Sequence, residues 1–267
     1  MKVPYFRWAA IIMAIISFGI AAFFAGKIYY AEREYAKGDS VYDALLEEAV
    51  AFEPEVPGVS PEPDGISDPG EIQENGNTLL PEIDFAALKE VNRDVIGWLY
   101  LPDTVINYPV VQGEDNTYYL KHLVDGTYNS NGCLFADHRN QQNFEDDNTL
   151  IYGHHMNSGK MFASLVKYKD QAFYDAHPEL FFITEDGAYR IEVFAGYTTR
   201  ADSDAYQIIL PGREEKIAWL KEQFHQSDFY ADVTVSATDH IVTFSTCAYD
   251  FANARYVVHG KVTKLEE

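Results

Sequence analysis

The sequence predicts a mainly β fold, either a barrel or a sandwich with helical insertions, carried behind an N-terminal transmembrane helix. Beyond Pro81, short apolar runs follow one another and are separated by turn-forming residues, which is typical of a β-rich domain. Near the N-terminus, residues 8–26 form a run of 19 residues without a charge. The chain has 267 residues, of which 47% are hydrophobic, so it can build a substantial core.

The apolar run 8–26 is nearly long enough to cross a membrane, because a helix rises about 1.5 Å per residue and the hydrocarbon core is about 30 Å thick. Basic residues lie on both sides of it, so their distribution indicates its orientation only weakly. A cleaved signal peptide is the alternative, but its apolar region is usually shorter, roughly 7 to 15 residues, and ends in an A-x-A-like site. We expect residues 1–28 to be an uncleaved, single-pass anchor in the cell membrane, with the rest of the chain extracellular.

The next two segments differ in composition. Residues 29–52 mix charges with apolar residues such as Tyr35, Tyr42 and Leu45, and we expect a helical stalk. Residues 53–80 are rich in proline, glycine and acids and hold few large apolar residues, which predicts an extended acidic linker. We expect this linker to give the folded domain, residues 81–267, its reach from the membrane.

Within the folded domain, a short helix is expected first. Asp84 is a plausible N-cap, and Phe85, Leu88 and Val91 follow at helical spacing. Extended apolar patterns bounded by turns then predict strands. The predicted strands are 96–101, 106–111, 133–136, 148–152, 189–197, 241–246 and 255–262. Helical spacing predicts two further helices, at 161–168 and 214–224.

Composition argues against several kinds of site. The net charge of -22, with no Lys/Arg cluster, argues against a nucleic-acid partner. Cys133 and Cys247 are too few for a disulfide framework or a cysteine zinc site. A single disulfide between them is possible, but we favour Cys133 as a small buried hydrophobic residue. Asp137 and His138 could ligate a metal, yet no H-x-x-x-H or H-x-H spacing supports a metal site.

Three residue types that can carry nucleophilic catalysis lie at predicted strand ends, where rigid scaffolds often present reactive groups. Cys247 follows the strand 241–246, and Arg255 opens the next strand. A guanidinium near a thiol favours the thiolate and can stabilise an oxyanion. His154 and His155 follow another strand and point opposite ways on an extended chain, so at most one is catalytic. Spacing alone is equally compatible with a buried structural cysteine and a surface arginine.

These residues resemble the sortase family of cysteine transpeptidases. Residues 243–247, Thr-Phe-Ser-Thr-Cys, match the signature T-L-x-T-C with an apolar phenylalanine in place of leucine. His154 after Gly153 resembles the family's catalytic histidine, and Arg255 resembles its arginine. Stretches 95–98, 108–113 and 152–156 resemble class B sortases in particular, and the helical stretch 214–224 resembles that class's long helical insertion. The resemblance covers about residues 83–264.

The resemblance implies an eight-stranded β-barrel with peripheral helices and a reaction that needs no cofactor. Cys247 would attack a Thr–Gly or Thr–Asn carbonyl in the sorting signal of a secreted protein of a Gram-positive bacterium. His154 would act as acid and base, and Arg255 would hold the carbonyl or oxyanion. The acceptor would be an amine of a peptidoglycan precursor, or a pilin lysine. Residues expected to bind the sorting signal are Ser245, Thr246, Tyr206 and Ile208.

Two alternatives stay open at this point. A hydrolytic cysteine peptidase would share the nucleophile and base but release its product to water, so amine-dependent product formation separates it from a transpeptidase. A non-catalytic, membrane-tethered wall-binding module would bury Cys247, so labelling of the thiol separates it from both enzymes.

Overall fold

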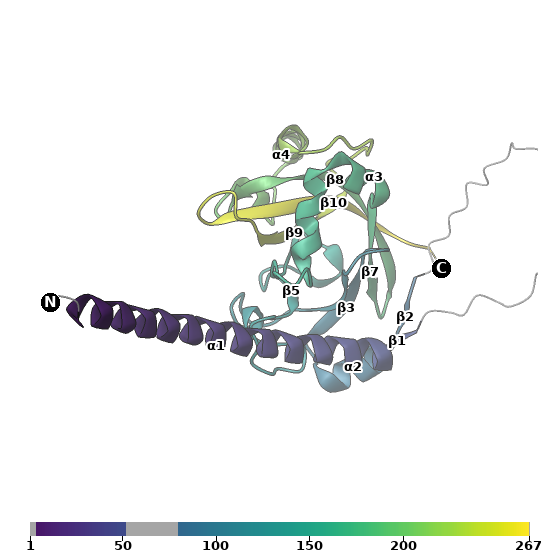
Figure 1. Cartoon of the computed structure of the whole chain (residues 1–267). Helices are drawn as coiled ribbons and strands as arrows, with labels where there is room; N and C mark the ends of the chain where they lie inside the picture. The colour runs from purple at the N-terminus through teal and green to yellow at the C-terminus, as the bar shows by residue number, and fades with distance from the viewer. Residues whose placement is uncertain (1–3, 52–79, 267) are drawn as a thin grey trace, which may run out of the picture.

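The centre of the molecule is a closed barrel of eight strands, in the order β10-β8-β7-β3-β4-β5-β6-β9 (Figure 1). The computed structural model describes residues 4–51 and 80–266. The barrel strands are β3 (Val95–Tyr100), β4 (Asn107–Val111), β5 (Leu134–Ala136), β6 (Asn148–Tyr152), β7 (Glu179–Thr184), β8 (Gly187–Arg200), β9 (His240–Cys247) and β10 (Ala254–Lys264). The eight-stranded barrel is therefore confirmed.

All seven predicted strands are present, but β7 was not predicted. Its sequence is Glu-Leu-Phe-Phe-Ile-Thr, and Leu180, Phe181 and Phe182 are all buried. Because consecutive side chains of a strand face opposite sides of the sheet, β7 is covered on both faces and lacks the apolar–polar alternation of a half-buried strand. A short continuous apolar run of this kind cannot be assigned from its periodicity.

Helices cover the barrel from several sides. The helix α2 (Phe85–Val91) begins as expected at Asp84, whose carboxylate accepts a hydrogen bond from the Ala87 N–H at 2.9 Å. Val91 is 43% exposed, so the buried face of α2 ends at Leu88. The remaining helices are α3 (Gln171–Ala176), α4 (Arg213–Gln226) and the 3-10 helices η1 (Tyr118–Leu120), η2 (Gln142–Phe144), η3 (Phe162–Lys169) and η4 (Asp204–Tyr206).

The predicted helix at 161–168 is the 3-10 helix η3, and α3 was not predicted. The helix predicted at 214–224 is α4, which lies between β8 and β9 in the chain. Its residues Trp219 and Leu220 join Phe194 and Ile241 of the barrel in a second, smaller core. This cluster fixes α4 on the outside of the barrel wall.

A single 46-residue helix, α1 (Pro4–Ala49), contains both the predicted anchor and the predicted stalk. In the described part of the chain, α1 is the one helix that is long and apolar enough to cross a membrane, judged by length and composition. Its first half projects away from the barrel and its second half runs along it (Figure 1). There Tyr42, Leu45 and Ala49 belong to the main hydrophobic core.

The residues on either side of the predicted acidic linker, residues 53–80, pair with each other. That linker lies outside the described residues apart from residue 80. Next to it, β1 (Val50–Ala51) pairs antiparallel with β2 (Glu82–Ile83), with Val50 opposite Ile83. Because α1 itself packs on the barrel, the barrel is already joined to the helix before this segment begins. That the segment gives the domain reach from the membrane stays a prediction.

Candidate active site

The register of three neighbouring strands brings the predicted catalytic residues together. The strands β6 and β9 are parallel, with Tyr152 opposite Ser245, so His154 and Cys247 each follow two residues later at the same level. The strands β9 and β10 are antiparallel, and Cys247 lies directly opposite Arg255. Opposed residues in such a pair have Cβ atoms about 4.5–5.5 Å apart. All three residues therefore lie at one end of the barrel.

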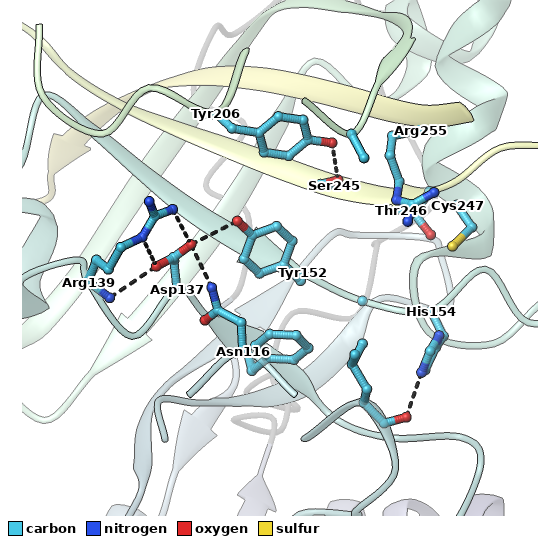
Figure 2. Close-up of a pocket in the computed structure, with 14 residues that line it drawn as sticks. Asn116, Asp137, Arg139, Tyr152, His154, Tyr206, Ser245, Thr246, Cys247 and Arg255 are labelled. Atoms are coloured by element: carbon cyan, nitrogen blue, oxygen red, sulfur yellow. Dashed lines mark hydrogen bonds and ion pairs between the residues drawn. The ribbon is translucent and has the colours of Figure 1, made fainter. Parts of the chain in front are cut away.

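A pocket of about 330 Å³ opens at this end of the barrel (Figure 2). It is lined by Asn116, Leu120, Phe135, Asp137, Arg139, Tyr152, Gly153, His154, Ala201, Tyr206, Ser245, Thr246, Cys247 and Arg255. Six of the seven predicted site residues are among them. Ile208 is not: it is half-buried, and its carbonyl accepts a hydrogen bond from the Asn148 N–H at 3.1 Å.

The two cysteines have different surroundings. Cys247 is a free thiol, half-buried, and it lines the pocket at the end of β9. Cys133 is also free and is only 1% exposed, as expected of a small core residue. The possible disulfide between them is thus not formed. Burial raises the pKa of the Cys133 thiol to about 12, so this thiol is kept protonated and unreactive.

The imidazole of His154 is held by a backbone carbonyl. Its Nε2 lies 2.7 Å from the carbonyl oxygen of Leu120 in η1. Because a carbonyl can only accept, Nε2 must carry the hydrogen, and Nδ1 is left to gain and lose a proton. His155 packs instead against Tyr249, with ring centroids 5.4 Å apart, and does not line the pocket. One of the two adjacent histidines reaches the pocket, in agreement with the alternation of an extended chain.

Arg255 lies beside Cys247 in the wall of the pocket (Figure 2). Its Nη1 donates a hydrogen bond to the Ala254 carbonyl at 3.0 Å, which fixes the guanidinium near the strand. A guanidinium has five N–H donors in a rigid plane, so several donors can still serve an oxygen of a bound substrate.

A buried carboxylate organises the opposite end of the pocket. Asp137 is fully buried and accepts hydrogen bonds from Arg139 Nε and Nη2 at 2.8 Å, from Asn116 Nδ2 at 2.8 Å and from Tyr152 Oη at 2.9 Å. Burial opposes ionisation, but the donors from Arg139, Tyr152 and Asn116 outweigh it and hold the pKa of Asp137 well below its ordinary value. The sequence suggested Asp137 only as a possible metal ligand, whereas its oxygens serve this network.

Tyr206 closes one side of the pocket. Its hydroxyl lies 2.8 Å from Ser245 Oγ, and its ring stacks on Tyr152 with centroids 6.4 Å apart. Burial raises the pKa of Tyr206 above its ordinary value. The helix α4 supports this arrangement, because Trp219 Nε1 donates to the Asp204 carbonyl of η4 at 2.8 Å. Thr246 is buried, and its Oγ1 finds no hydrogen-bond partner among the described residues.

Several residues of this site were not predicted from the sequence. Asn116 and Leu120 lie in a segment that carries no strand pattern, and Leu120 contributes its backbone carbonyl rather than its side chain. Arg139 and Tyr152 reach the pocket through the network around Asp137. No local sequence signal identifies such residues, since their partners lie far away along the chain.

Several known proteins are similar to this chain in fold and in sequence. The Sortase domain model matches residues 99–263. Sortase B of Listeria monocytogenes is 40% identical over 180 residues, which cover 66% of this chain and 73% of that protein. The Staphylococcus aureus sortase B-substrate complex has a TM-score of 0.65 at 34% identity and covers 68% of this chain and 85% of that one. A sortase B complexed with triglycine has a TM-score of 0.64 at 34% identity, with coverages of 68% and 86%.

The matched region includes all of strands β4 to β9, the end of β3 and nearly all of β10. It also contains His154, Cys247 and Arg255. The family resemblance noted in the signature around Cys247 is thereby confirmed. The chain belongs to the sortase family and is a class B sortase, an enzyme of the cysteine transpeptidase class.

Proposed function

We propose that this enzyme cleaves the C-terminal sorting signal of a secreted surface protein after a threonine. It transfers the acyl group to an amine of a peptidoglycan precursor or to a pilin lysine. The observation that carries the proposal is the meeting of Cys247, His154 and Arg255 at one end of an open pocket. The related structures solved with a substrate and with triglycine support a peptide donor and an amine acceptor.

In the first half of the reaction, the Cys247 thiolate attacks the threonine carbonyl carbon and Arg255 donates to the oxygen that becomes negative. The C–N bond then breaks, and the leaving amine takes a proton from the protonated His154 ring. The product is a thioester on Cys247. Because His154 Nε2 donates its hydrogen to the Leu120 carbonyl, the transferred proton is the one on Nδ1.

In the second half, the acceptor amine attacks the thioester carbonyl, and its proton passes to His154 Nδ1. The C–S bond breaks, the Cys247 thiolate leaves, and an amide bond joins the two substrates. Every group in these steps comes from the chain or from one of the two substrates. The peptide segment before the scissile bond would lie along Ser245, Thr246 and Tyr206, which continue the pocket away from the nucleophile.

The apolar part of α1 would anchor the enzyme in the cell membrane as a single span, with the barrel on the outer face. Both substrates of the proposed reaction are themselves attached to the membrane or the wall. Confining the enzyme to the same surface raises the effective concentration of each substrate. In the described part of α1, hydrogen bonding to the barrel begins at Glu34, eight residues after Gly26, or about 12 Å along the helix. The pocket would therefore be held close to the bilayer.

The test uses the full chain in detergent micelles with quenched peptides that carry P-x-T-G or P-x-T-N cores, each with and without an added amine. Cys247→Ala should lower cleavage at least about a thousand-fold, because it removes the nucleophile. Cys133→Ala is the matched control and should leave the reaction within about two-fold, because Cys133 is buried away from the pocket.

A peptide–amine adduct found by mass spectrometry would establish transpeptidation and identify the motif. Cleavage that depends on Cys247 but gives no adduct with any amine would favour the hydrolytic peptidase. If no peptide is cleaved and the Cys247 thiol resists alkylation, the proposed reaction is wrong.

A further inference from the structure

One stretch of α1, from Glu34 to Tyr42, is hydrogen-bonded to a single loop of the barrel, residues 129–132. Asn129 Nδ2 donates to the Glu34 carbonyl at 2.8 Å. Ser130 donates to the Glu34 carboxylate through its N–H at 3.0 Å and its hydroxyl at 2.9 Å. The first half of the loop is thus held by one turn of the helix.

The second half of the loop is held by the next turns of α1. Asn131 Nδ2 donates to the Tyr35 carbonyl at 3.1 Å and to Asp39 Oδ1 at 3.0 Å. The Tyr42 hydroxyl donates to the Gly132 carbonyl at 2.6 Å, in a buried environment. All four residues of the loop therefore have a hydrogen bond to α1.

Gly38 allows this close contact. A Cβ atom at Gly38 would lie 2.5 Å from Asn131 Nδ2 and 2.9 Å from Asn129 Oδ1, closer than real Cβ contacts. Glycine inside a helix costs about 1 kcal/mol relative to alanine, so its presence here calls for a packing reason. By contrast, a Cβ at Gly26 of the same helix would meet nothing within 4 Å.

The other side of the loop packs against the catalytic histidine. Gly132 has φ +60°, and a Cβ there would lie 3.0 Å from His154 Cδ2, 3.0 Å from the Leu120 carbonyl oxygen and 2.6 Å from that of Tyr119. The next residue, Cys133, donates its N–H to the Tyr119 carbonyl at 3.0 Å. The carbonyl of Leu120 is the group that holds His154 Nε2. A single layer of backbone thus separates α1 from the imidazole.

We infer that the second half of the anchor helix α1 is a positioning element for His154. It acts through the loop 129–132, which it holds against η1 and the histidine ring. The inference rests on the proposed function, because it takes His154 as the acid and base of the reaction. A displacement of about 1 Å at a reacting group can cost on the order of a hundred-fold in rate. Peptide binding at Tyr206 and Ser245 lies outside this chain of contacts, so the effect should fall on kcat rather than on KM.

The experiment compares Gly38→Ala with Gly26→Ala in the full chain in detergent micelles. The two substitutions are chemically identical and lie in the same helix. Gly38→Ala should lower kcat of the peptide-to-amine transfer about ten- to a hundred-fold and leave KM for the peptide within about two-fold. Gly26→Ala should match the wild type.

A second pair of variants keeps the volume of the side chain. Tyr42→Phe removes the donor to Gly132, whereas Tyr30→Phe removes an exposed hydroxyl from the same helix. We expect a kcat loss of about three- to ten-fold for the first and no change for the second. In chains with 15N-labelled histidine, the His154 signal, assigned from a His154→Gln spectrum, should shift in Gly38→Ala and in Tyr42→Phe but in neither control.

Thermal melting of each variant separates positioning from unfolding. If folded Gly38→Ala retains the wild-type kcat, or loses activity with an unchanged His154 signal, the inference is overturned. If Gly38→Ala does not fold, Tyr42→Phe decides by the same two readouts. An inactive wild type, or one that is unaffected by His154→Gln, would refute the proposed function instead of this inference.

Discussion

His259 is a fully buried histidine in the barrel wall, packed among aromatic rings that include Tyr197 and Trp219. Its Nδ1 lies 2.8 Å from the Thr243 hydroxyl, which itself donates to Asn148 Oδ1 at 2.7 Å, so Nδ1 must be the donor to Thr243. Nε2 has no hydrogen-bond partner among the described residues. Burial lowers the pKa of His259 to about 3, so the ring is neutral in the folded enzyme.

This histidine should make the stability depend on pH. In the unfolded chain the pKa returns to about 6.5, so below that pH the unfolded state binds a proton that the folded state excludes. The stabilisation is complete above pH 6.5 and is lost as the pH falls toward 3. We expect the free energy of unfolding to drop by about 2 kcal/mol between pH 7 and pH 5. Urea titrations at pH 7 and pH 5 should show this drop in the wild type and a smaller one in His259→Gln. An equal drop in the two proteins would show that His259 is not the group responsible.

Arg255 gives a prediction about geometry rather than charge. Arg255→Lys keeps the positive charge but loses the planar set of donors, so it should still lower kcat/KM of the transfer reaction by about ten- to a hundred-fold. Arg255→Ala should cost more, about a hundred- to a thousand-fold. Arg213→Lys, at an exposed position of α4, is the control and should be neutral. Full activity of Arg255→Lys would show that charge alone is sufficient.

Among the helices, α4 supports the 3-10 helix η4. The support is a hydrogen bond of 2.8 Å from Trp219 Nε1 to the Asp204 carbonyl. Tyr206, at the end of η4, then reaches the pocket and meets Ser245. The helix thus shapes the Tyr206 end of the pocket without contributing a residue to its lining.

Trp219→Phe should remove this hydrogen bond and keep most of the aromatic packing. We expect KM for the sorting peptide to rise about two- to five-fold, kcat to stay near the wild-type value, and stability to fall by about 1 kcal/mol. Steady-state kinetics in a Tyr206→Ala background supply the check: if Trp219 acts through Tyr206, the second substitution should add no further rise in KM. An equal rise in both backgrounds would show a separate effect.

Taken as a whole, α1 and the barrel form one packed unit, and the residues on either side of segment 52–79 pair with each other. Residues Val50 and Ile83 are paired, although the chain between them is long. Replacing residues 54–79 by four Gly/Ser residues should therefore leave the transfer activity unchanged. It should raise the free energy of unfolding by about 1 kcal/mol, because a shorter loop costs less entropy to close.

Activity assays and denaturant titrations of this shortened chain provide the test. A loss of transfer activity of more than about five-fold, with an intact melting transition, would show that the replaced residues take part in the reaction. The same assay on cells that carry the membrane-anchored enzyme would report whether the length of segment 54–79 matters for reaching the wall.

Features that depend on neighbouring residues could be predicted from the sequence alone. The uncharged run 8–26 predicts a helix, Asp84 predicts a helix start, and short extended apolar runs bounded by turns predict seven of the eight barrel strands. The signature around Cys247, with His154 and Arg255, led to the family. Each of these signals is contained in a few consecutive residues, where backbone periodicity and local chemistry act directly.

The remaining features of the fold and of the site are visible only in the folded chain, because they depend on residues far apart in the sequence. The closed strand order includes the parallel pair β6–β9, which no local pattern reveals. Asp137 became the centre of a hydrogen-bonded network rather than a metal ligand once Asn116 and Tyr152 were folded around it. Tyr42 meets Gly132 across 90 positions of sequence, and this packing turned the expected stalk into part of the core. Such contacts are specified by the shapes of both partners together, so neither partner's local sequence predicts them.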